Sequence, residues 1–254
     1  MAVERSGKST FLELLELHAV AAASPAPNRA KNDDAFLFAA PGLPFAERCR
    51  CGYILGVADG VSAGGHGAAA SNQTVDTIRR CLSDPAASGP SARGSILERA
   101  LVSANEGVRA RESAAGVLSG STASFVWLWE EEIDDGAAVM RGVWVHVGDS
   151  RLYTLTDEGA RLLTTDDKLG HGITRWVGME PEKFSYHKGS LDLAPGDVLV
   201  LVTDGVWEGA AIDSRLRPSA GRELADVVDD LLRRARKGGS RDDATVVLAR
   251  VSQS

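Results

Sequence analysis

The stretch ILGVADGVSAGGHG, residues 54–67, runs an apolar strand directly into an acid followed by a glycine. A later stretch, LVLVTDGVWEG at residues 199–209, repeats the pattern and places Asp204 and Gly205 after its own apolar run. Asp-Gly is a common turn dipeptide, so each site alone is consistent with a simple turn. A carboxylate at the end of a buried strand is costly, however, unless a cation lies opposite it. The repeated pattern therefore indicates either two turns or two carboxylates that share a cationic partner.

Two further acidic pairs stand beside apolar strands. Asp33 and Asp34 precede the run AFLFA, and Asp242 and Asp243 precede ATVVLARV. Strand ends of one sandwich converge on one edge, so we expect these acids and Asp59 to meet. Clustered carboxylates repel one another and raise one another's pKa unless a cation neutralises them. The acids together therefore favour a cation site over independent turns.

The residue types indicate which cation this site would take. No Cys or His adjoins any of these acids, so the implied ions are Mg²⁺ or Mn²⁺, which prefer oxygen ligands. The glycine after Asp59 allows a backbone carbonyl to approach an ion as well. Two such ions about 3.5–4 Å apart hold a bridging water and generate hydroxide at neutral pH. This is hydrolase chemistry, most naturally on a phosphoester.

Arg29 is the candidate phosphate ligand. It stands four residues before Asp33 in RAKNDD, close enough to face the same site. A guanidinium fork matches phosphate oxygens with two parallel hydrogen bonds. The alternative is an ordinary surface arginine.

Composition limits the class of protein. The chain has 254 residues, 44% of them hydrophobic and 25% charged, which predicts one globular domain over residues 1–254. Its formal net charge of −7 argues against a nucleic-acid partner. Three cysteines provide no disulfide framework, and no apolar run approaches the ~20 residues of a membrane span. We therefore expect a cytoplasmic protein with no membrane partner.

Periodicity predicts a mixed architecture. Helical spacing occurs at residues 11–17, 68–82, 96–111 and 221–236, and most of the remaining chain reads as short β-branched or alternating strands. The helices are inserted among many strands without regular βαβ alternation. This order favours an antiparallel α+β sandwich over a doubly wound parallel sheet. GDSR, residues 148–151, is interpreted as a hairpin turn between two strands.

Six motifs in a fixed order carry a resemblance to a known family. They are RAKNDDAF, GVADGVSAGGHG, SGSTA, VGDSRLY, LVTDGVWE and SRDDATVVLA, and together they span residues 29–249. The chain resembles the bacterial form of the metal-dependent PP2C (PPM) family of Ser/Thr protein phosphatases. The resemblance implies a four-layer α-β-β-α sandwich with two central antiparallel sheets. It also implies hydrolysis of phosphoserine and phosphothreonine in proteins at a binuclear Mg²⁺ or Mn²⁺ site.

The resemblance implies a role for each acid of the first metal site. Asp59 would bridge the two metals, with the Gly60 carbonyl on one of them. Asp204 and Asp242 would complete the protein ligands of the first metal.

The resemblance likewise assigns the second metal and the phosphate. Asp33 and Asp34 would hold the second metal mostly through its waters, and Arg29 would bind the substrate phosphate. Asp33 stands where the family usually has Glu, a change expected to shift a water-mediated contact. Asp149 and Ser150 in GDSR are expected to be structural.

Two departures from the family pattern concern a third metal and a flap. Relatives often use an acid shortly before the GST element, but SAAGVLSGST has none between residues 114 and 118. Only Asp166 matches the family's ligands for that ion, so we expect two ions per chain and a third that is weak or absent. The segment of residues 168–174 is shorter than the usual flap, and a short loop is expected there.

The implied partners are phosphorylated proteins, namely a cognate Ser/Thr kinase or its targets, and the chain is expected to be a monomer. Two alternatives remain open at this point. One is a degenerate phosphatase that binds phosphoproteins as a regulatory module. The other is a phosphatase of a small phosphomonoester or of an anti-sigma-factor antagonist. A metal-dependent assay on p-nitrophenyl phosphate separates the enzyme from the module.

Overall fold

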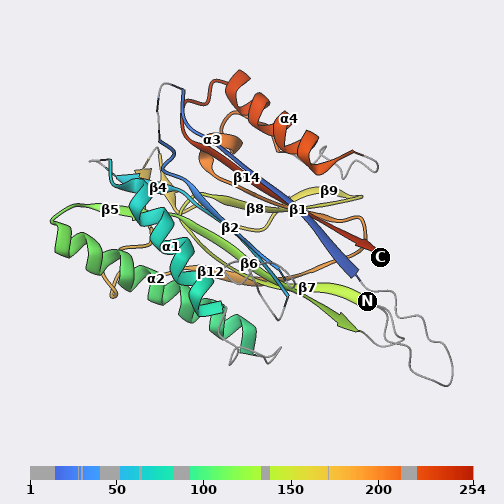
Figure 1. Ribbon diagram of the computed structural model, residues 1–254, viewed down its shortest axis with the longest axis horizontal. Helices are drawn as coiled ribbons and strands as arrows, with labels where there is room; N and C mark the ends of the chain where they lie inside the picture. The colour runs from blue at the N-terminus through green and yellow to red at the C-terminus, as the bar shows by residue number, and fades with distance from the viewer. Residues whose placement is uncertain are drawn as a thin grey trace.

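The structure of the protein is a computed structural model, which describes residues 15–27, 29, 31–40, 52–62, 65–82, 92–132, 138–170, 172–212 and 222–253. Within these ranges, two five-stranded antiparallel sheets form the centre of the molecule (Figure 1). Helices lie on the outer side of each sheet, so the order of layers is helix, sheet, sheet, helix.

The first sheet contains the strands from both ends of the described chain. Its order is β1 (Leu15–Ser24), β14 (Ala244–Gln253), β13 (Val198–Val202), β8 (Arg151–Thr156) and β9 (Gly159–Leu162). Helix α4 (Leu224–Lys237) covers its outer face, and the single turn α3 (Asp204–Trp207) follows β13 directly.

The second sheet has the order β12 (His187–Leu193), β7 (Ala138–Val147), β6 (Ala123–Glu132), β3 (Tyr53–Ala58) and β2 (Ala35–Ala39). Helices α1 (Gly67–Leu82) and α2 (Arg93–Ala115) cover its outer face. Two small pairs complete the topology. They are β4 (Gly60–Ser62) with β5 (Ser119–Ser121), and β10 (Lys168–Leu169) with β11 (Gly172–Ile173).

Strand alternation creates three hydrophobic cores. On β6, Phe125 and Trp127 pack toward α1 and α2, whereas Val126 and Leu128 pack between the sheets. On β13, Leu199 lies between the sheets and Val200 lies under α4. Successive side chains of a strand point to opposite faces, so the central strands are buried on both sides. This explains why they read as continuous apolar runs.

The fold prediction is confirmed: the chain is α+β with two central antiparallel sheets and helices outside. The helices predicted at 68–82, 96–111 and 221–236 are α1, α2 and α4, with ends displaced by at most four residues. The first helix of the sequence analysis is wrong over residues 15–17. Those residues belong to β1, because pairing with β14 along ten residues overrides a short local period.

The prediction of a hairpin at GDSR is also wrong. Strand β7 pairs with β6 and β12 in the second sheet, whereas β8 pairs with β13 and β9 in the first. Residues 148–150 therefore cross from one sheet to the other. Gly148 has a φ of 103°, and a Cβ there would lie 2.6 Å from a Thr122 methyl carbon, so the crossing requires glycine.

The segment after Asp167 differs from the short loop that was predicted. Lys168 and Leu169 pair with Gly172 and Ile173 as a small antiparallel hairpin. An isolated bridge between Ser121 and Val177 then attaches the following residues to β5. The segment is short, but it is folded.

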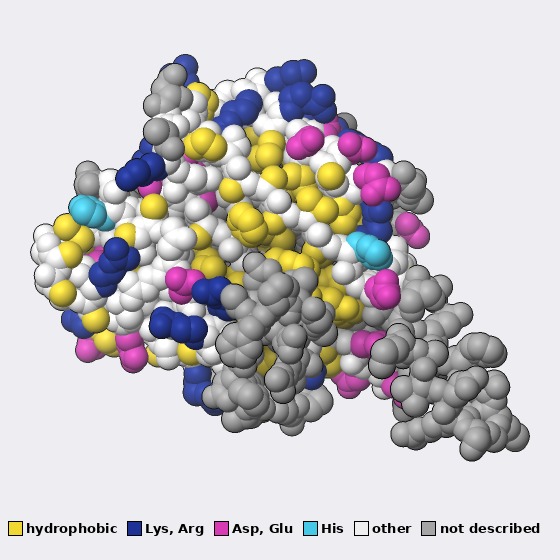
Figure 2. Space-filling view, viewed as in Figure 1, with side chains coloured by type: hydrophobic (Ala, Val, Ile, Leu, Met, Phe, Trp, Pro, Cys, Tyr) yellow, Lys and Arg dark blue, Asp and Glu magenta, His cyan; other side chains and the backbone are white. Residues whose placement is uncertain are grey.

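The view of Figure 1 looks onto the edge strands of the two sheets, β1 and β2. Figure 2 shows hydrophobic side chains gathered across the middle of this same face, with charged side chains around them. None of the helices in the described ranges has the length and hydropathy needed to cross a membrane.

Candidate active site

A cavity of about 650 Å³ lies where several strand ends and connections meet. Asp59 follows strand β3, and Asp204 follows strand β13. Asp149 lies in the segment that crosses from one sheet to the other, and Asp242 lies two residues before strand β14. The elements β4, β5 and the beginning of α1 lie at the same end of the sandwich (Figure 1). Its described charged lining residues are six acids and two cations: Asp33, Asp59, Asp149, Asp204, Glu208, Asp242, Arg29 and Lys168.

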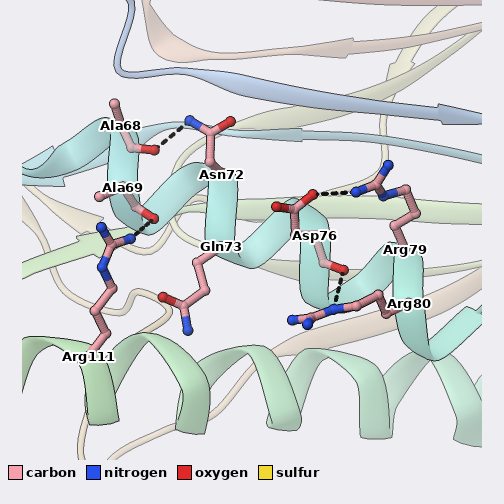
Figure 3. Close-up of a pocket in the computed structure, with 8 residues that line it drawn as sticks. All are labelled: Ala68, Ala69, Asn72, Gln73, Asp76, Arg79, Arg80 and Arg111. Atoms are coloured by element: carbon pink, nitrogen blue, oxygen red, sulfur yellow. Dashed lines mark hydrogen bonds and ion pairs between the residues drawn. The ribbon is translucent and has the colours of Figure 1, made fainter. Parts of the chain in front are cut away.

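A second hollow lies between α1 and α2, and it lacks comparable chemistry (Figure 3). Two arginines of α1 bind Asp76: Arg79 donates to its Oδ1 at 2.7 Å, and Arg80 donates to its carbonyl. Arg111 of α2 donates to the Ala69 carbonyl at 2.8 Å. The Arg79–Asp76 ion pair is exposed and contributes little, and the other two arginines bind backbone carbonyls. The acid-lined cavity is therefore the candidate site.

Asp59 and Asp204 form the centre of the acid cluster. Burial raises the pKa of Asp59 well above its ordinary value, and the charges of Asp34 and Asp204 raise it further. Burial and the charge of Asp149 raise the pKa of Asp204 to about 7, although a hydrogen bond with Asp59 opposes this shift. Two hydrogen bonds with Thr122 hold the Asp59 backbone in place: the Asp59 N–H donates to the Thr122 side-chain Oγ1, and the Asp59 carbonyl accepts from the Thr122 N–H. Both shifts indicate a position that favours a nearby positive charge.

Asp34 lies deeper than the cavity surface and is held by two threonines. Thr203 and Thr245 donate their hydroxyl hydrogens to Asp34 Oδ2 at 2.8 and 2.7 Å. Burial raises the pKa of Asp34 to about 7, and these two hydrogen bonds oppose the shift. The sequence analysis did not select either threonine. Their only signal was position, since one precedes Asp204 and the other follows Asp243 by two residues.

Asp149 is an acid whose position the sequence analysis undervalued. Its side chain is almost fully buried, and Lys168 Nζ lies 3.2 Å from its Oδ2. The same ammonium lies 3.4 Å from Glu208 Oε1 and 4.7 Å from the centre of the Trp207 ring. Burial raises the pKa of Asp149, and Lys168 opposes the shift. Since residues 148–150 cross between the sheets, Asp149 reaches the cluster instead of a solvent-exposed turn.

Arg29 lies at the edge of the cavity, oriented by two acids. Its Nη2 is 2.6 Å from Asp33 Oδ2 and its Nη1 is 3.3 Å from Asp243 Oδ2. Asp243 also accepts hydrogen bonds from the N–H groups of Ala26 and Asp33, so it anchors the segment that carries Arg29. Close to half of the Arg29 side chain remains exposed, which leaves it able to meet a ligand.

The other acid of the terminal pair, Asp242, is 59% exposed and lies at the rim of the cavity. Asp166 is not brought to the cavity. Its two oxygens accept hydrogen bonds from Arg151 Nε at 3.0 Å and Nη2 at 2.7 Å, and Arg151 stacks on Trp207. Glu112, the nearest acid before the SGST motif, binds the Ser119 N–H.

Gly60 allows two backbone segments to touch. A Cβ at this position would lie 2.2 Å from the Gly67 carbonyl oxygen and 2.5 Å from the Asp33 carbonyl oxygen. The Gly60 N–H donates to the Asp33 carbonyl at 3.1 Å, which links β4 to the segment that bears Asp33 and Asp34. Glycine is thus required here for packing, in addition to any role of its carbonyl as a ligand.

Replacing Gly60 by alanine is therefore expected to lower the melting temperature by roughly 2–12 °C, since overpacking typically costs 1–3 kcal/mol. The Gly67 and Asp33 backbones would have to move away from Gly60, which would also displace the acids of the cavity. Gly94→Ala is the matched control, since a Cβ there meets only one side-chain atom, at 4.0 Å. Differential scanning fluorimetry measures both variants, and equal melting temperatures would contradict the expectation.

The fit of the cavity to divalent cations depends on its donor atoms. Among the described residues, no group of three or more His, Cys, Asp or Glu side chains already has the arrangement of a metal site. The donor chemistry nevertheless fits. Three buried carboxylate oxygens in the described chain have no hydrogen-bond partner, Asp34 Oδ1, Asp149 Oδ1 and Asp204 Oδ1, and all three belong to this cluster. Buried acids that repel one another and lack donors are stabilised by a hard cation.

Comparison with solved structures supports the same fold. PppA, described as a key regulatory component of T6SS in Pseudomonas aeruginosa, is 26% identical with a TM-score of 0.74, covering 92% of this chain and 97% of that one. The Mycobacterium tuberculosis serine/threonine phosphatase PstP/Ppp is 22% identical with a TM-score of 0.74, covering 94% and 100%. The PstP catalytic domain in complex with two manganese ions is 22% identical with a TM-score of 0.71, covering 94% and 100%.

No curated protein matches the sequence at a significant level. A family model does: the one described as Stage II sporulation protein E (SpoIIE) matches residues 51–252, which is most of the chain. That range includes five of the six motifs on which the PP2C resemblance rested. With the family model and the fold in agreement, the chain belongs to the SpoIIE family of PP2C-type bacterial Ser/Thr phosphatases.

Proposed function

We propose that this chain hydrolyses phosphoserine and phosphothreonine in proteins, using two Mg²⁺ or Mn²⁺ ions held by the acid cluster. The observation that carries the proposal is the set of three unpartnered carboxylate oxygens in one cluster, with the half-exposed Arg29 guanidinium at the edge of the same cavity. A guanidinium binds anions and the acid cluster suits cations, so a phosphate ester fits between Arg29 and cations held by the acids. PstP, which has been solved with two manganese ions, has the same fold and supports the metal count.

In this proposal Asp59, the Gly60 carbonyl, Asp204 and Asp242 would hold the first ion, and Asp59 would also contribute to the second. Divalent ions, when bound, supply a hydroxide nucleophile at neutral pH and neutralise charge on the phosphoryl oxygens. Asp59 and Asp204 contribute the charges that favour such ions, and Thr122 keeps the Asp59 backbone fixed.

Asp33 and Asp34 support the second ion in different ways. Both Asp33 oxygens already accept hydrogen bonds, from Arg29 and from the Ala68 N–H, so Asp33 would act on the ion through water. Two threonines donate to Asp34 Oδ2, whereas Oδ1 has no donor and would be available to the ion. Asp166, paired with Arg151, would contribute only to a weak third ion or to none.

The test is phosphate release from a phosphothreonine peptide by the purified chain, with and without Mn²⁺. Metal-dependent release supports the proposal. Tight peptide binding without release would favour a phosphoprotein-binding module, and hydrolysis of p-nitrophenyl phosphate alone would favour a small phosphomonoester. We propose phosphorylated proteins of a signalling system as the partners, namely a cognate kinase or its targets. The similar protein PppA is described as a regulatory component of T6SS, which supports this choice.

Replacing Arg29 by alanine is expected to raise KM for a phosphopeptide by about tenfold, with a smaller effect on kcat. A phosphate contact made in both ground and transition states contributes uniform binding. Arg29→Lys keeps the charge but loses the fork, so its KM should lie between those of wild type and Arg29→Ala. Steady-state kinetics give KM and kcat for the three proteins. An unchanged KM in Arg29→Ala would show that Arg29 is an ordinary surface arginine that does not bind the phosphate.

A further inference from the structure

The acid-lined cavity has a second, apolar wall. Val61, Leu118, Ile173 and Trp176 line it together with the acids. Leu118 is 74% exposed and Val61 is 39% exposed, so two of these side chains expose large apolar surfaces beside the cavity. Single exposed apolar residues are ordinary, but several that converge on one cavity mark a binding surface.

The wall is built onto a fixed backbone. Ser121 and Val177 exchange two backbone hydrogen bonds, of 3.1 and 2.7 Å, which attach the segment bearing Trp176 to β5. The Trp176 indole lies directly against Gly120, since a Cβ there would be 2.2 Å from Trp176 Cδ1. A fixed aromatic platform binds a ligand with little further loss of conformational entropy.

The residues just before Trp176 are anchored as well. Arg175 Nη2 lies 2.6 Å from Asp167 Oδ1, and that carboxylate is fully buried. The Thr174 N–H donates to the Asp167 carbonyl at 2.7 Å, while Asp167 Oδ2 accepts from the Gly148 N–H. The small hairpin and Trp176 are therefore tied to the same crossing segment that carries Asp149. The apolar wall and the acid cluster are held in one relative position.

Leu118 is exposed for a local reason. It stands between α2 and β5, and its neighbour Ser119 donates its N–H to the Glu112 carboxylate. Helix α2 ends at Gly116 with a φ of 66°, a left-handed conformation that suits glycine. The backbone on both sides of Leu118 is thus positioned, while its side chain remains available at the cavity.

We infer that this apolar wall receives an apolar side chain next to the phosphorylated residue of a protein substrate. The inference rests on the proposed function, which places the phosphate between Arg29 and the acid cluster. An extended peptide advances about 3.3 Å per residue, so a flanking side chain falls within the same cavity. Glu208, an acid of the same cavity to which the proposal gives no metal, disfavours acidic flanking residues. The chemistry selected is therefore a phosphoserine or phosphothreonine with an aliphatic or aromatic neighbour.

The experiment compares two phosphothreonine peptides that differ only in the flanking residues, leucine in one and serine in the other, with Mn²⁺ present. The wild-type chain is expected to show a KM at least tenfold lower for the leucine peptide, because burial of one aliphatic side chain is worth roughly that factor. Leu118→Ser should reduce this preference severalfold. Leu162→Ser, an equally polar change at a 42% exposed leucine on β9 outside the cavity, should keep the wild-type preference.

Each outcome decides between the proposals. Equal KM values for the two peptides on the wild-type chain would overturn the apolar wall while leaving the phosphatase proposal intact. A preference that survives in both Leu118→Ser and Trp176→Ala would also overturn it, once melting curves show that both variants are folded. If neither peptide is hydrolysed, the proposed function fails instead. Fluorescence anisotropy with the same peptides, carrying a fluorescent label, then measures binding without hydrolysis. Equal dissociation constants for the two peptides would contradict the inferred role of the apolar wall.

Discussion

Replacing Asp59 by asparagine is expected to lower kcat/KM for a phosphopeptide by about 10³-fold or more. The reason is that Asp59 lies at the centre of the acid cluster, where its pKa responds to the charges of Asp34 and Asp204 together. If Asp59 holds the ions as proposed, loss of its charge would remove several kcal/mol of metal-derived stabilisation, and about 4 kcal/mol corresponds to a factor near 10³. The measurement is steady-state phosphate release at saturating Mn²⁺.

The same variant is expected to fold, and to melt a few degrees higher than wild type in the absence of metal. Asparagine has nearly the shape of aspartate but removes one of several repelling buried charges. Asp76→Asn is the matched control, because it makes the same chemical change at an exposed acid of the other hollow. Near-normal kcat in Asp59→Asn, or a loss of activity as large in Asp76→Asn, would contradict the assigned role.

Removing divalent cations is expected to abolish activity completely, and adding Mn²⁺ back should restore it. All of the charged donors in the cluster are carboxylates, whose cations exchange with a chelator such as EDTA. Binding of Mn²⁺ should also be detectable in the absence of substrate, as an increase in melting temperature. At an ion concentration of 100 Kd the folded state gains about 2.7 kcal/mol, which corresponds to an increase in melting temperature of roughly 5–11 °C.

The chelator experiment has two independent readouts, phosphate release and the melting temperature. Asp204→Asn should lose most of the Mn²⁺-dependent increase in melting temperature, whereas Asp166→Asn should keep it, because Arg151 already occupies both Asp166 oxygens. Full activity after exhaustive EDTA treatment would falsify the two-metal proposal. An equal loss of thermal stabilisation in both variants would show that Asp166 also holds an ion.

Much of the candidate site follows from local sequence patterns. An apolar run that ends in Asp-Gly predicts a strand with an acid at its end, and the structure has β3 followed by Asp59 and β13 followed by Asp204. Helix α1 follows from its apolar stripe, which Val75, Ile78 and Leu82 bury against the second sheet. Such patterns depend on neighbours within about one turn or one strand, so they are legible without knowledge of the rest of the chain.

The partners of each acid were decided only by tertiary structure. GDSR has the composition of a hairpin, yet it connects two sheets, and this brings Asp149 into the cluster. Asp166 matched a family position, yet Arg151 from β8 binds it outside the cavity. Asp243 stood beside a proposed ligand, yet it anchors the segment of Arg29.

The physical reason for this division is the range of the interactions. A strand's alternation of side chains is a property of the strand alone, whereas its sheet and neighbours depend on pairing between segments more than a hundred residues apart, as for β1 with β14. The sequence by itself determined the family, the two-sheet architecture and the acids at the strand ends. Tertiary structure decided which carboxylate oxygens remain without donors and which apolar side chains share their cavity, because both depend on how the two sheets pack together.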